Sequence, residues 1–583
     1  MSLPVGLNRS RSAVVFVVNE ITPGLINAQV DANDAFGLTT TPVMGQSGNY
    51  TDTSEIGAEL ISVDRVLNYM EYATYDFEYY AKPGGTDLST TVDMSFGGTD
   101  GTVSENGSGL VTFTMAVGGT LSSDIEVGGT IQINNVDLTI VDVNSGAGTF
   151  AVQWEAAAAT AYVASVGGNV ATVQLVRYNF AQNPEHDLLA RSFGGVKYMS
   201  RGEVYAGGVL AAKGSGYYAG DGSGAGSYVP SKANATAAQF FLKNTVQTFT
   251  VTSRQFTDKS IQMYTATGSL PTNFSVTFAK DGPVTFSSSF QSNRVFYGGT
   301  ATIDTTSPIN IAGSGLNNGD TTLTITDPIR YGMGATNKIE SGDVAWYHAD
   351  SSIGMACKLM DANGAVYPSS DTEFFTVAST SGADVTINNT TATSYPFSAG
   401  VDLYLIPFTP APCPDTGGIL DQRKVQVFLT DAPALSEDLI KTFDWEPTDN
   451  TQLFHPFNAL DVTSVNLDFD RSITTPGLTE MTGEEFPPAS YIINEPTISG
   501  SMTLLLRPKD FQFMNSLRDE PRRSVGIRVG SVDGKIIEIG IAAAFLEIPT
   551  PSDADGATQI DIGFTAIRGV ECDDADKFMV RYR

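Results

Sequence analysis

The chain has 583 residues, and at about 150 residues per domain this length predicts three or four domains. Its 64 acidic and 33 basic residues give a formal net charge of −31, which argues against a protein that wraps or grips nucleic acid. Hydrophobic residues make up 41% of the chain, enough for several cores, and this excludes an intrinsically disordered protein.

Glycine and small polar residues separate many short apolar runs. The 58 glycines lie among plentiful Ser, Thr, Asn and Asp, a pattern typical of many strands and tight turns, so we expect a mainly β fold. No apolar run approaches the roughly 18 residues of a membrane span, and the first run, 13–18, is shorter than a signal-peptide core. We therefore expect a soluble protein, made inside the cell, that does not associate with membranes.

The first predicted element is a strand at 14–18, followed by two β-prone runs at 61–69 and 72–82. Side chains alternate along a strand, so the run at 72–82 has a polar face and an apolar face. The polar face carries Thr74, Asp76, Glu78 and Lys82, and the apolar face carries Ala73, Tyr75, Phe77, Tyr79 and Ala81.

Two segments look like insertions. At 86–176, short strands separated by Gly-rich and Asn-rich turns predict a small all-β module, and 299–407 predicts a second one. Between them, a short helix is predicted at 184–193, because Pro and Glu stand in its first turn and Gly194 follows its end. A glycine-rich stretch at 201–237 predicts an exposed loop.

The chain contains an internal echo. The runs 71–83 and 495–508 are both alternating strands that end in a basic residue and a proline. Each is preceded by a shorter strand, and each leads to a short amphipathic helix, at 186–193 in one case and at 510–517 in the other. This pattern predicts a duplicated unit of sheet and helix with different insertions, although alternation alone also makes unrelated strands look alike.

Residues of this repeated pattern, together with a stretch between the two copies, resemble a known family. They are V-T-S-V-N-L-D-F-D-R at 462–471, T-I-S-G-S-M-T-L at 497–504, the helix at 510–517, and the 256–278 stretch with its Gly-Ser-Leu-Pro at 268–271. On these residues the chain resembles the tail tube proteins of long-tailed bacteriophages, in their large, internally duplicated form. The resemblance covers the two copies of the unit and leaves the inserted segments without a counterpart.

The resemblance implies a fold and an assembly. Each unit is then a β-sandwich or barrel with a short helix, and six units make a ring, so two units per chain give a homotrimer with pseudo-sixfold symmetry. Rings stack into the tube through which the genome leaves. The implied division of the chain is an N-terminal arm with the first part of unit 1 at 1–85, insertions at 86–176 and 299–407, the remainder of unit 1 at 177–298, and unit 2 at 408–583.

The resemblance also implies partners and a place. The protein would pair with itself and with the tape measure, terminator and distal tail proteins, and genomic DNA would pass without specific binding. It would be made in the cytoplasm of the host bacterium and end in the virion tail. Contractile and non-contractile tails are both compatible with the sequence.

An acidic lumen agrees with the charge, because a phosphate chain that slides past carboxylates finds no cation to pair with. The candidates for lumen-facing residues lie on the polar faces of the predicted strands: Thr74, Asp76, Glu78, Asn466, Asp468, Asp470, Ser499 and Ser501. The plain alternative is that these are ordinary solvated strand faces.

No motif of catalysis or metal binding stands out. The three histidines are far apart, the three cysteines are odd in number and widely spaced, and the glycine run at 220–226 lacks the Gly-Lys-Ser/Thr of a phosphate loop. We therefore predict a protein that is not an enzyme and has no cofactor, no catalytic residues and no metal site. Two alternatives stay open: a virion decoration or receptor-binding protein or bacterial surface adhesin, and, least favoured, a polysaccharide-cleaving enzyme.

Overall fold

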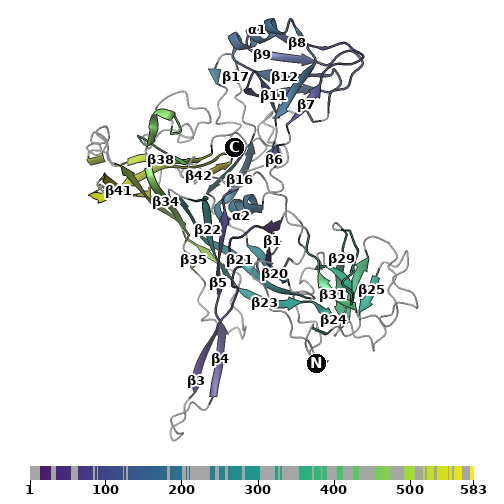
Figure 1. Cartoon of the computed structure of the whole chain (residues 1–583), viewed down its shortest axis with the longest axis vertical. Helices are drawn as coiled ribbons and strands as arrows, with labels where there is room; N and C mark the ends of the chain where they lie inside the picture. Colours follow the sequence, from purple (N-terminus) through teal and green to yellow (C-terminus); the bar gives the residue numbers. More distant parts are fainter. Residues whose placement is uncertain are drawn as a thin grey trace.

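The computed structural model confirms a mainly β protein, with two α-helices among the described residues. The described residues are 13–20, 22–27, 30, 34–53, 64–82, 86–87, 89–122, 124–125, 129–176, 178–179, 184–199, 205–206, 209–210, 237–242, 248–256, 260–278, 282–302, 322–325, 329–330, 354–370, 373–381, 384–389, 403–410, 425–431, 453–460, 462–471, 473–474, 491–494, 496–505, 517–518, 522–530, 535–548, 550–554, 557–567 and 578–582. Figure 1 shows a central body of strands, two smaller sheets beside it and a long two-stranded hairpin.

Eighteen hydrogen-bonded strands build the body. They are β1 (Ala13–Asn19), β2 (Ala35–Phe36), β5 (Ala73–Tyr80), β16 (Gly194–Met199), β19 (Ala237–Leu242), β20 (Phe249–Phe256), β21 (Ile261–Phe278), β22 (Thr285–Ser292), β23 (Arg294–Gly299), β32 (Val425–Asp431), β33 (Ala459–Leu460), β34 (Val462–Asp470), β37 (Thr497–Leu505), β38 (Arg522–Val529), β39 (Ile537–Leu546), β40 (Thr550–Ala554), β41 (Ala557–Ala566) and β42 (Phe578–Tyr582). The strand predicted at 14–18 and those predicted in the last third of the chain are among them.

Six of these strands form one continuous antiparallel layer, which we call the polar sheet. Its order is β5–β22–β21–β34–β37–β41, with β40 added beyond β41. The strands come from both ends of the chain, because β21 pairs with β22 on one side and with β34 on the other. The segments predicted to belong to two separate units therefore share a sheet.

Strand β21 is long because it serves two layers. Its first half pairs with β20 and β23, and β20 also pairs with β1. Its second half belongs to the polar sheet. Gly268 marks the change with a φ of 58°, a left-handed conformation that favours glycine. The Glu20 carboxylate accepts a hydrogen bond from the Gly268 N–H at 2.8 Å, and the Tyr491 hydroxyl donates one to the Gly268 carbonyl at 2.6 Å. The N–H and the carbonyl of Gly268 are therefore both hydrogen-bonded.

A second layer contains the strands β32–β38–β39–β42–β19–β16. Its charged side chains are paired across the strands. Arg528 Nε on β38 donates to Glu538 Oε1 on β39 at 2.7 Å, and Arg581 Nε on β42 donates to Glu538 Oε2 at 2.7 Å. Both guanidinium groups lie over the ring of Phe454, so the buried charges are paired and covered.

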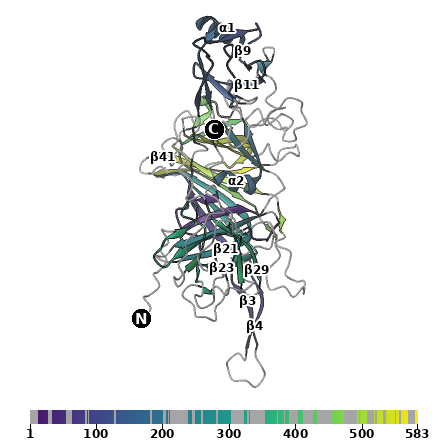
Figure 2. The ribbon, with the colours of Figure 1, turned by 90° about the vertical axis from the view of Figure 1, so that its right-hand side faces the viewer.

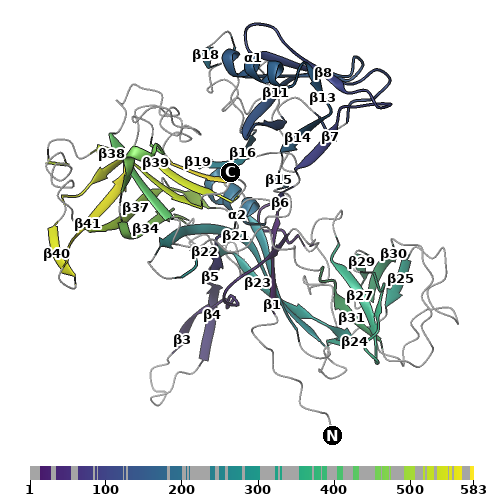
Figure 3. The ribbon, with the colours of Figure 1, turned by 45° about the horizontal axis from the view of Figure 1, so that its top comes forward.

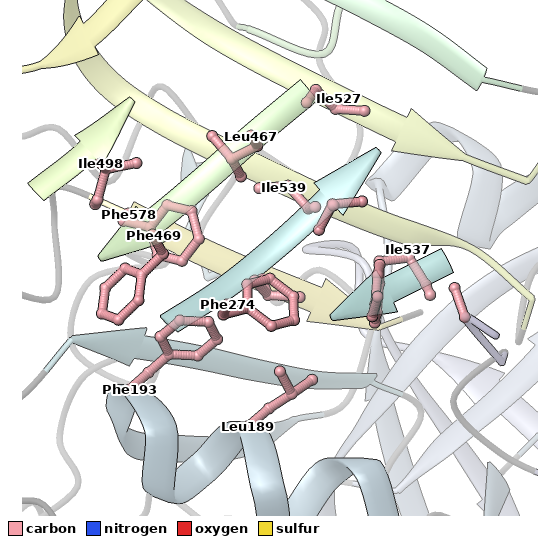
Figure 4. Close-up of a cluster of buried hydrophobic side chains, with 14 of the residues drawn as sticks. Leu189, Phe193, Phe274, Leu467, Phe469, Ile498, Ile527, Ile537, Ile539 and Phe578 are labelled. Atoms are coloured by element: carbon pink, nitrogen blue, oxygen red, sulfur yellow. The ribbon is translucent and has the colours of Figure 1, made fainter. Parts of the chain in front are cut away.

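The main core fills the space between these layers. Alternate residues of the polar sheet point into it, and helix α2 (Pro184–Phe193), at the place predicted from sequence, packs against it. Figure 4 shows Phe193 directed at aromatic rings of three strands. Its ring centroid lies 5.5 Å from that of Phe274, 5.1 Å from that of Phe469 and 5.2 Å from that of Phe578. The helix thus joins side chains from both parts of the chain.

The first small sheet has the order β13-β8-β9-β12-β11-β10-β14-β7 and its own core. Its strands are β7 (Thr90–Asp93), β8 (Gly101–Glu105), β9 (Leu110–Thr114), β10 (Thr130–Ile133), β11 (Val136–Asn144), β12 (Thr149–Gln153), β13 (Asn169–Val170) and β14 (Thr172–Val176). The expectation that this segment is all-β is wrong, because α1 (Ala156–Ser165) packs on it. Four successive alanines begin α1, and alanine has the highest helix propensity.

The strands β6 (Thr86–Asp87) and β15 (Tyr178–Asn179) pair where the chain leaves the body for this sheet and returns. The second small sheet contains β24 (Ala301–Thr302), β25 (Thr322–Ile325), β26 (Ile329–Arg330), β27 (Ala356–Asp361), β28 (Val366–Tyr367), β29 (Phe375–Ser381), β30 (Asp384–Asn389) and β31 (Leu403–Pro407). Figures 1 and 3 place the two small sheets at separate sides of the body.

The strands β3 (Gly48–Thr53) and β4 (Asp64–Met70) form the hairpin, which projects from the body in Figures 1 and 2. The run predicted at 61–69 therefore pairs with an upstream strand and continues into β5 after two residues. The remaining elements are the pairs β17 (Tyr205–Ala206) with β18 (Val209–Leu210) and β35 (Ile473–Thr474) with β36 (Ile492–Ile493), and a 3-10 turn at Pro456–Asn458. Most of the predicted helix at 510–517, and most of the 201–237 loop, lie outside the described residues.

Candidate functional site

All eight residues predicted to face a lumen lie on one face of the polar sheet. The pairing register shows this, because residues directly opposite each other in an antiparallel sheet point to the same side. One row across the sheet contains Glu78, Ser287, Ser275, Asp468, Ser499 and Thr565, each opposite the next. A second row contains Asp76, Ser289, Asn273, Asp470 and Thr497. The polar faces predicted separately are thus one surface.

The opposite face of the same strands is apolar. Burial alternates strictly along β5, with Thr74, Asp76 and Glu78 exposed and the aromatic residues between them buried. On β34, Leu467 and Phe469 are buried while the neighbouring aspartates are at least partly exposed. If the sheet were turned over, its carboxylates would be buried, and this cost determines which face of the sheet meets water.

The polar face carries negative charge and no positive charge. The six strands contain five carboxylate residues and not one Lys, Arg or His within their bounds. Four of the carboxylates are the predicted Asp76, Glu78, Asp468 and Asp470. An anionic polymer passing this surface would meet repulsion and hydroxyl groups, with no cation on these strands to bind it.

The fifth carboxylate, Asp561 on β41, was not predicted as part of this surface. It is exposed and accepts a hydrogen bond from Thr503 Oγ1 at 2.6 Å. Asp561 alternates with Ile560 and Ile562, which are buried, so the same period-two pattern identifies its face.

Glu547 reaches the polar face from outside the six strands. Its peptide N–H donates to the Gly563 carbonyl at 2.8 Å. A Cβ built on Gly563 would lie 2.6 Å from Glu547 Oε2, so the glycine leaves the space that this carboxylate occupies. No local pattern in the sequence relates positions 547 and 563, and only the fold brings them together.

Hydroxyl and amide groups make up the rest of the surface. Asn466 Oδ1 accepts the Ser501 peptide N–H and the Ser501 hydroxyl, both at 2.7 Å, which ties two predicted residues on neighbouring strands. A shallow depression on the β5 side is lined by Thr40, Asp76, Glu78, Ser275, Thr277, Thr285, Ser287 and Ser289. The Ser and Thr residues of β21 and β22 were not predicted as part of this surface.

One lateral end of the polar sheet, and part of the other, are open among the described residues. At one end, Glu78 accepts a hydrogen bond from the Thr39 N–H at 2.8 Å, which shows that even-numbered peptide groups of β5 point outward. The outward groups of Thr74 and Asp76 have no backbone partner in the described parts of the chain. At the other end the last residues of β39 pair with one part of β41, and β40 pairs with the other part, so among the described strands only the outer edge of β40 is open.

Exposed apolar side chains accompany these open ends. Val43, which is 86% exposed, lies on the segment that bonds to β5 through Thr39 and to Glu71, just before β5, through Ser47. Near the other end, Ile548 is 63% exposed and Phe545 is 47% exposed. Large exposed apolar groups beside open strand edges are typical of surfaces that a partner covers.

The described residues contain no group of three or more His, Cys, Asp or Glu arranged to hold a metal ion. Within the described part of the chain, no helix combines the length and the apolar character that crossing a membrane requires. Among family models and curated proteins alike, no match to this chain was found.

Proposed function

We propose that this protein is a structural subunit that assembles into stacked rings, forming the tail tube of a long-tailed bacteriophage. The observation that carries the proposal is the polar sheet: a six-stranded surface with carboxylates and hydroxyls, no cation and an apolar reverse side. Turned toward the axis of a ring, this face lines a channel that DNA crosses without binding.

The open edges supply the lateral contacts. An unpaired strand edge invites a neighbouring chain, and a head-to-tail contact that closes on itself makes a ring. The β5 edge of one subunit meets the β40 edge of the next, so the polar sheet continues around the channel. Val43, Phe545 and Ile548 become covered at the same junctions. With two predicted units in each chain, three chains complete the ring.

The β3–β4 hairpin supplies the axial contact. A two-stranded hairpin is marginally stable alone in water, yet this one extends away from the body (Figure 2). Tyr50 and Leu67 are opposite each other on one face and are 52% and 36% exposed. Because β4 runs directly into β5, the hairpin extends beyond the polar sheet in the strand direction and contacts the adjacent ring.

The deciding experiment is negative-stain electron microscopy of the purified protein after size-exclusion chromatography. Hollow rings or tubes with threefold averages are expected. Compact particles that never stack contradict the proposal, above all if they bind glycans.

That contrary result favours the second candidate, a decoration, receptor-binding or adhesive protein. The observation behind it is the first small sheet, which exposes Phe96 and Val117 at 53% and 98% on loops beyond the paired strands β6 and β15. Glycan-array binding by the full chain, lost in a Phe96→Ala variant, would support this alternative.

A further inference from the structure

Arg254 on β20 is a cation buried within the body. Its side chain is 1% exposed, and its guanidinium carbon lies 5.0 Å from the centroid of the Phe16 ring. Two of its nitrogens, Nε and Nη1, are buried and make no hydrogen bond. Buried polar groups are nearly always paired, so such a group calls for a partner that the described residues do not supply.

The surroundings of Arg254 are apolar or uncharged. The register puts Val14 and Met263 directly opposite it on the two neighbouring strands. The next row on the same face contains Phe16, Thr252 and Thr265, and the two threonine hydroxyls lie 3.4 Å apart. Val14 is partly buried, and the other four side chains are buried.

Glu20 is a buried carboxylate on this face, and its oxygens already accept hydrogen bonds from other groups. Glu20 follows β1 at its far end from Val14, the partner of Arg254. Its oxygens accept hydrogen bonds from Gly24, Thr248, Thr250 and Gly268. Burial lowers the pKa of Arg254 to about 9, so the side chain keeps its charge at neutral pH. The protomer therefore holds a charged guanidinium without a carboxylate among the described residues to balance it.

We propose that Arg254 binds a small inorganic anion of about chloride size, with the Thr252 and Thr265 hydroxyls as further donors. The near-complete burial of the side chain favours an ion that fits inside the packed interior over a segment of another protein. A buried guanidinium with flanking hydroxyl donors has the chemistry of an anion site. The site lies outside the polar sheet, and the proposal does not depend on ring formation.

The test is thermal unfolding of the full chain at constant ionic strength, with sodium gluconate replaced stepwise by sodium chloride. A ligand that binds only the folded state raises the melting temperature in a saturable way. We expect this response in the wild type and not in Arg254→Met, and we expect Arg254→Met to melt above the wild type in gluconate. The matched control is Arg65→Met, which removes an exposed guanidinium 5.4 Å from the Tyr50 ring and should keep the full response.

Anomalous scattering from bromide locates the ion independently of any variant. A peak beside the Arg254 guanidinium in wild-type crystals is expected. An equal chloride response in wild type and Arg254→Met overturns the proposal, as does a water molecule or a carboxylate from a second copy at that position. If Arg254→Met does not fold, the bromide map and an Arg254→Gln variant decide the question.

Discussion

Single side chains of α2 hold the two parts of the body together. Phe193 stacks edge-on with rings from β21, β34 and β42, so one residue contacts strands from distant parts of the chain. Glu185, in the first turn of the same helix, is 4% exposed. Burial raises the pKa of Glu185 to about 8, and the nearby Lys82 ammonium only partly opposes this. Phe193 therefore fixes the packing of α2 in the body, and Glu185 makes the stability of this packing sensitive to pH.

Truncating Phe193 should destabilise the body strongly. Phe193→Ala removes a fully buried ring and leaves a cavity among aromatic neighbours, at an expected cost of about 3–5 kcal/mol. Differential scanning calorimetry should show a lower melting temperature for the body. Phe96→Ala, at an exposed ring in the first small sheet, is the control and should change stability by about 0.5 kcal/mol or less. Equal effects of the two variants would contradict the packing described for α2.

Glu185 should make the protein less stable as the pH rises. Its pKa is raised from 4.5 to about 8 in the folded state, so unfolding releases a proton between these values. Stability from this group is complete below about pH 4.5 and is lost as the pH rises toward 8. Glu185→Gln should match the wild type at pH 4 and exceed it by about 2–4 kcal/mol at pH 8, in urea unfolding at both pH values. An equal gain from Glu185→Gln at pH 4 and pH 8 would contradict this prediction.

At the scale of elements, the proposed assembly depends on strand edges that are open among the described residues and on the hairpin. β5 is an edge strand whose outward peptide groups at Thr74 and Asp76 are open among the described residues. On one face of the hairpin the exposed Tyr50 and Leu67 lie opposite each other, beside Asp52 and Arg65. On the other face Asn68 bonds to Asn49 and Thr51. The proposed lateral and axial contacts thus use different elements and can be separated by mutation.

A proline at position 74 should block the lateral contact without unfolding the sheet. Proline is tolerated on edge strands but removes an outward N–H, and a neighbouring strand needs that donor. Thr74→Pro should keep its β-rich circular dichroism spectrum and fail to form rings by electron microscopy. Thr74→Ala keeps the peptide N–H and should assemble. Normal rings from the proline variant would exclude β5 as the joining edge.

Charges at Tyr50 and Leu67 of the hairpin should separate ring formation from stacking. The double variant Tyr50→Asp with Leu67→Asp puts carboxylates where an apolar contact is proposed, so single rings should accumulate in place of tubes. Thr51→Asp, on the opposite face of the hairpin, should still give tubes. The lengths of particles in negative stain measure the outcome, and long tubes from the double variant would assign the axial contact elsewhere.

At the scale of the whole molecule, the acidic polar sheet and the buried cations lie in different places. The chain is strongly acidic overall, and the polar sheet has no cation on its six strands. The buried cations lie elsewhere, for example Arg528 and Arg581 around Glu538 in the second layer. This separation keeps one broad surface uniformly repulsive to polyanions.

Reversing the charge of that surface should change how it treats DNA. Asp76, Glu78, Asp468 and Asp470, all replaced by lysine, should still permit folding because these side chains are not buried. Tubes should form, bind double-stranded DNA in low salt by fluorescence anisotropy, and deliver it poorly when built into particles. Reversing the same number of acids in the first small sheet is the control. Normal delivery by the polar-sheet variant would contradict the proposal that this face lines a channel.

Much of the fold was predictable from local patterns. Period-two alternation correctly placed Thr74, Asp76 and Glu78 on an exposed face, and the capping signals correctly placed α2. The same alternation placed Asp468 on the face of its strand opposite to Leu467 and Phe469. These features depend on neighbouring residues only, and the sequence therefore determines which side of each strand meets water.

Only the tertiary structure decided that these faces form one surface. Glu78 and Asp468 share a row because β22 and β21 lie between their strands, and no local signal specifies pairing between segments so far apart. The approach of Glu547 to Gly563 and the burial of Arg254 have the same origin. Side chains alternate along a strand because of the backbone geometry, so the sequence alone determines the two faces of each strand. Strand partners depend on the packing of the whole core, so only the fold determines which faces join into one surface.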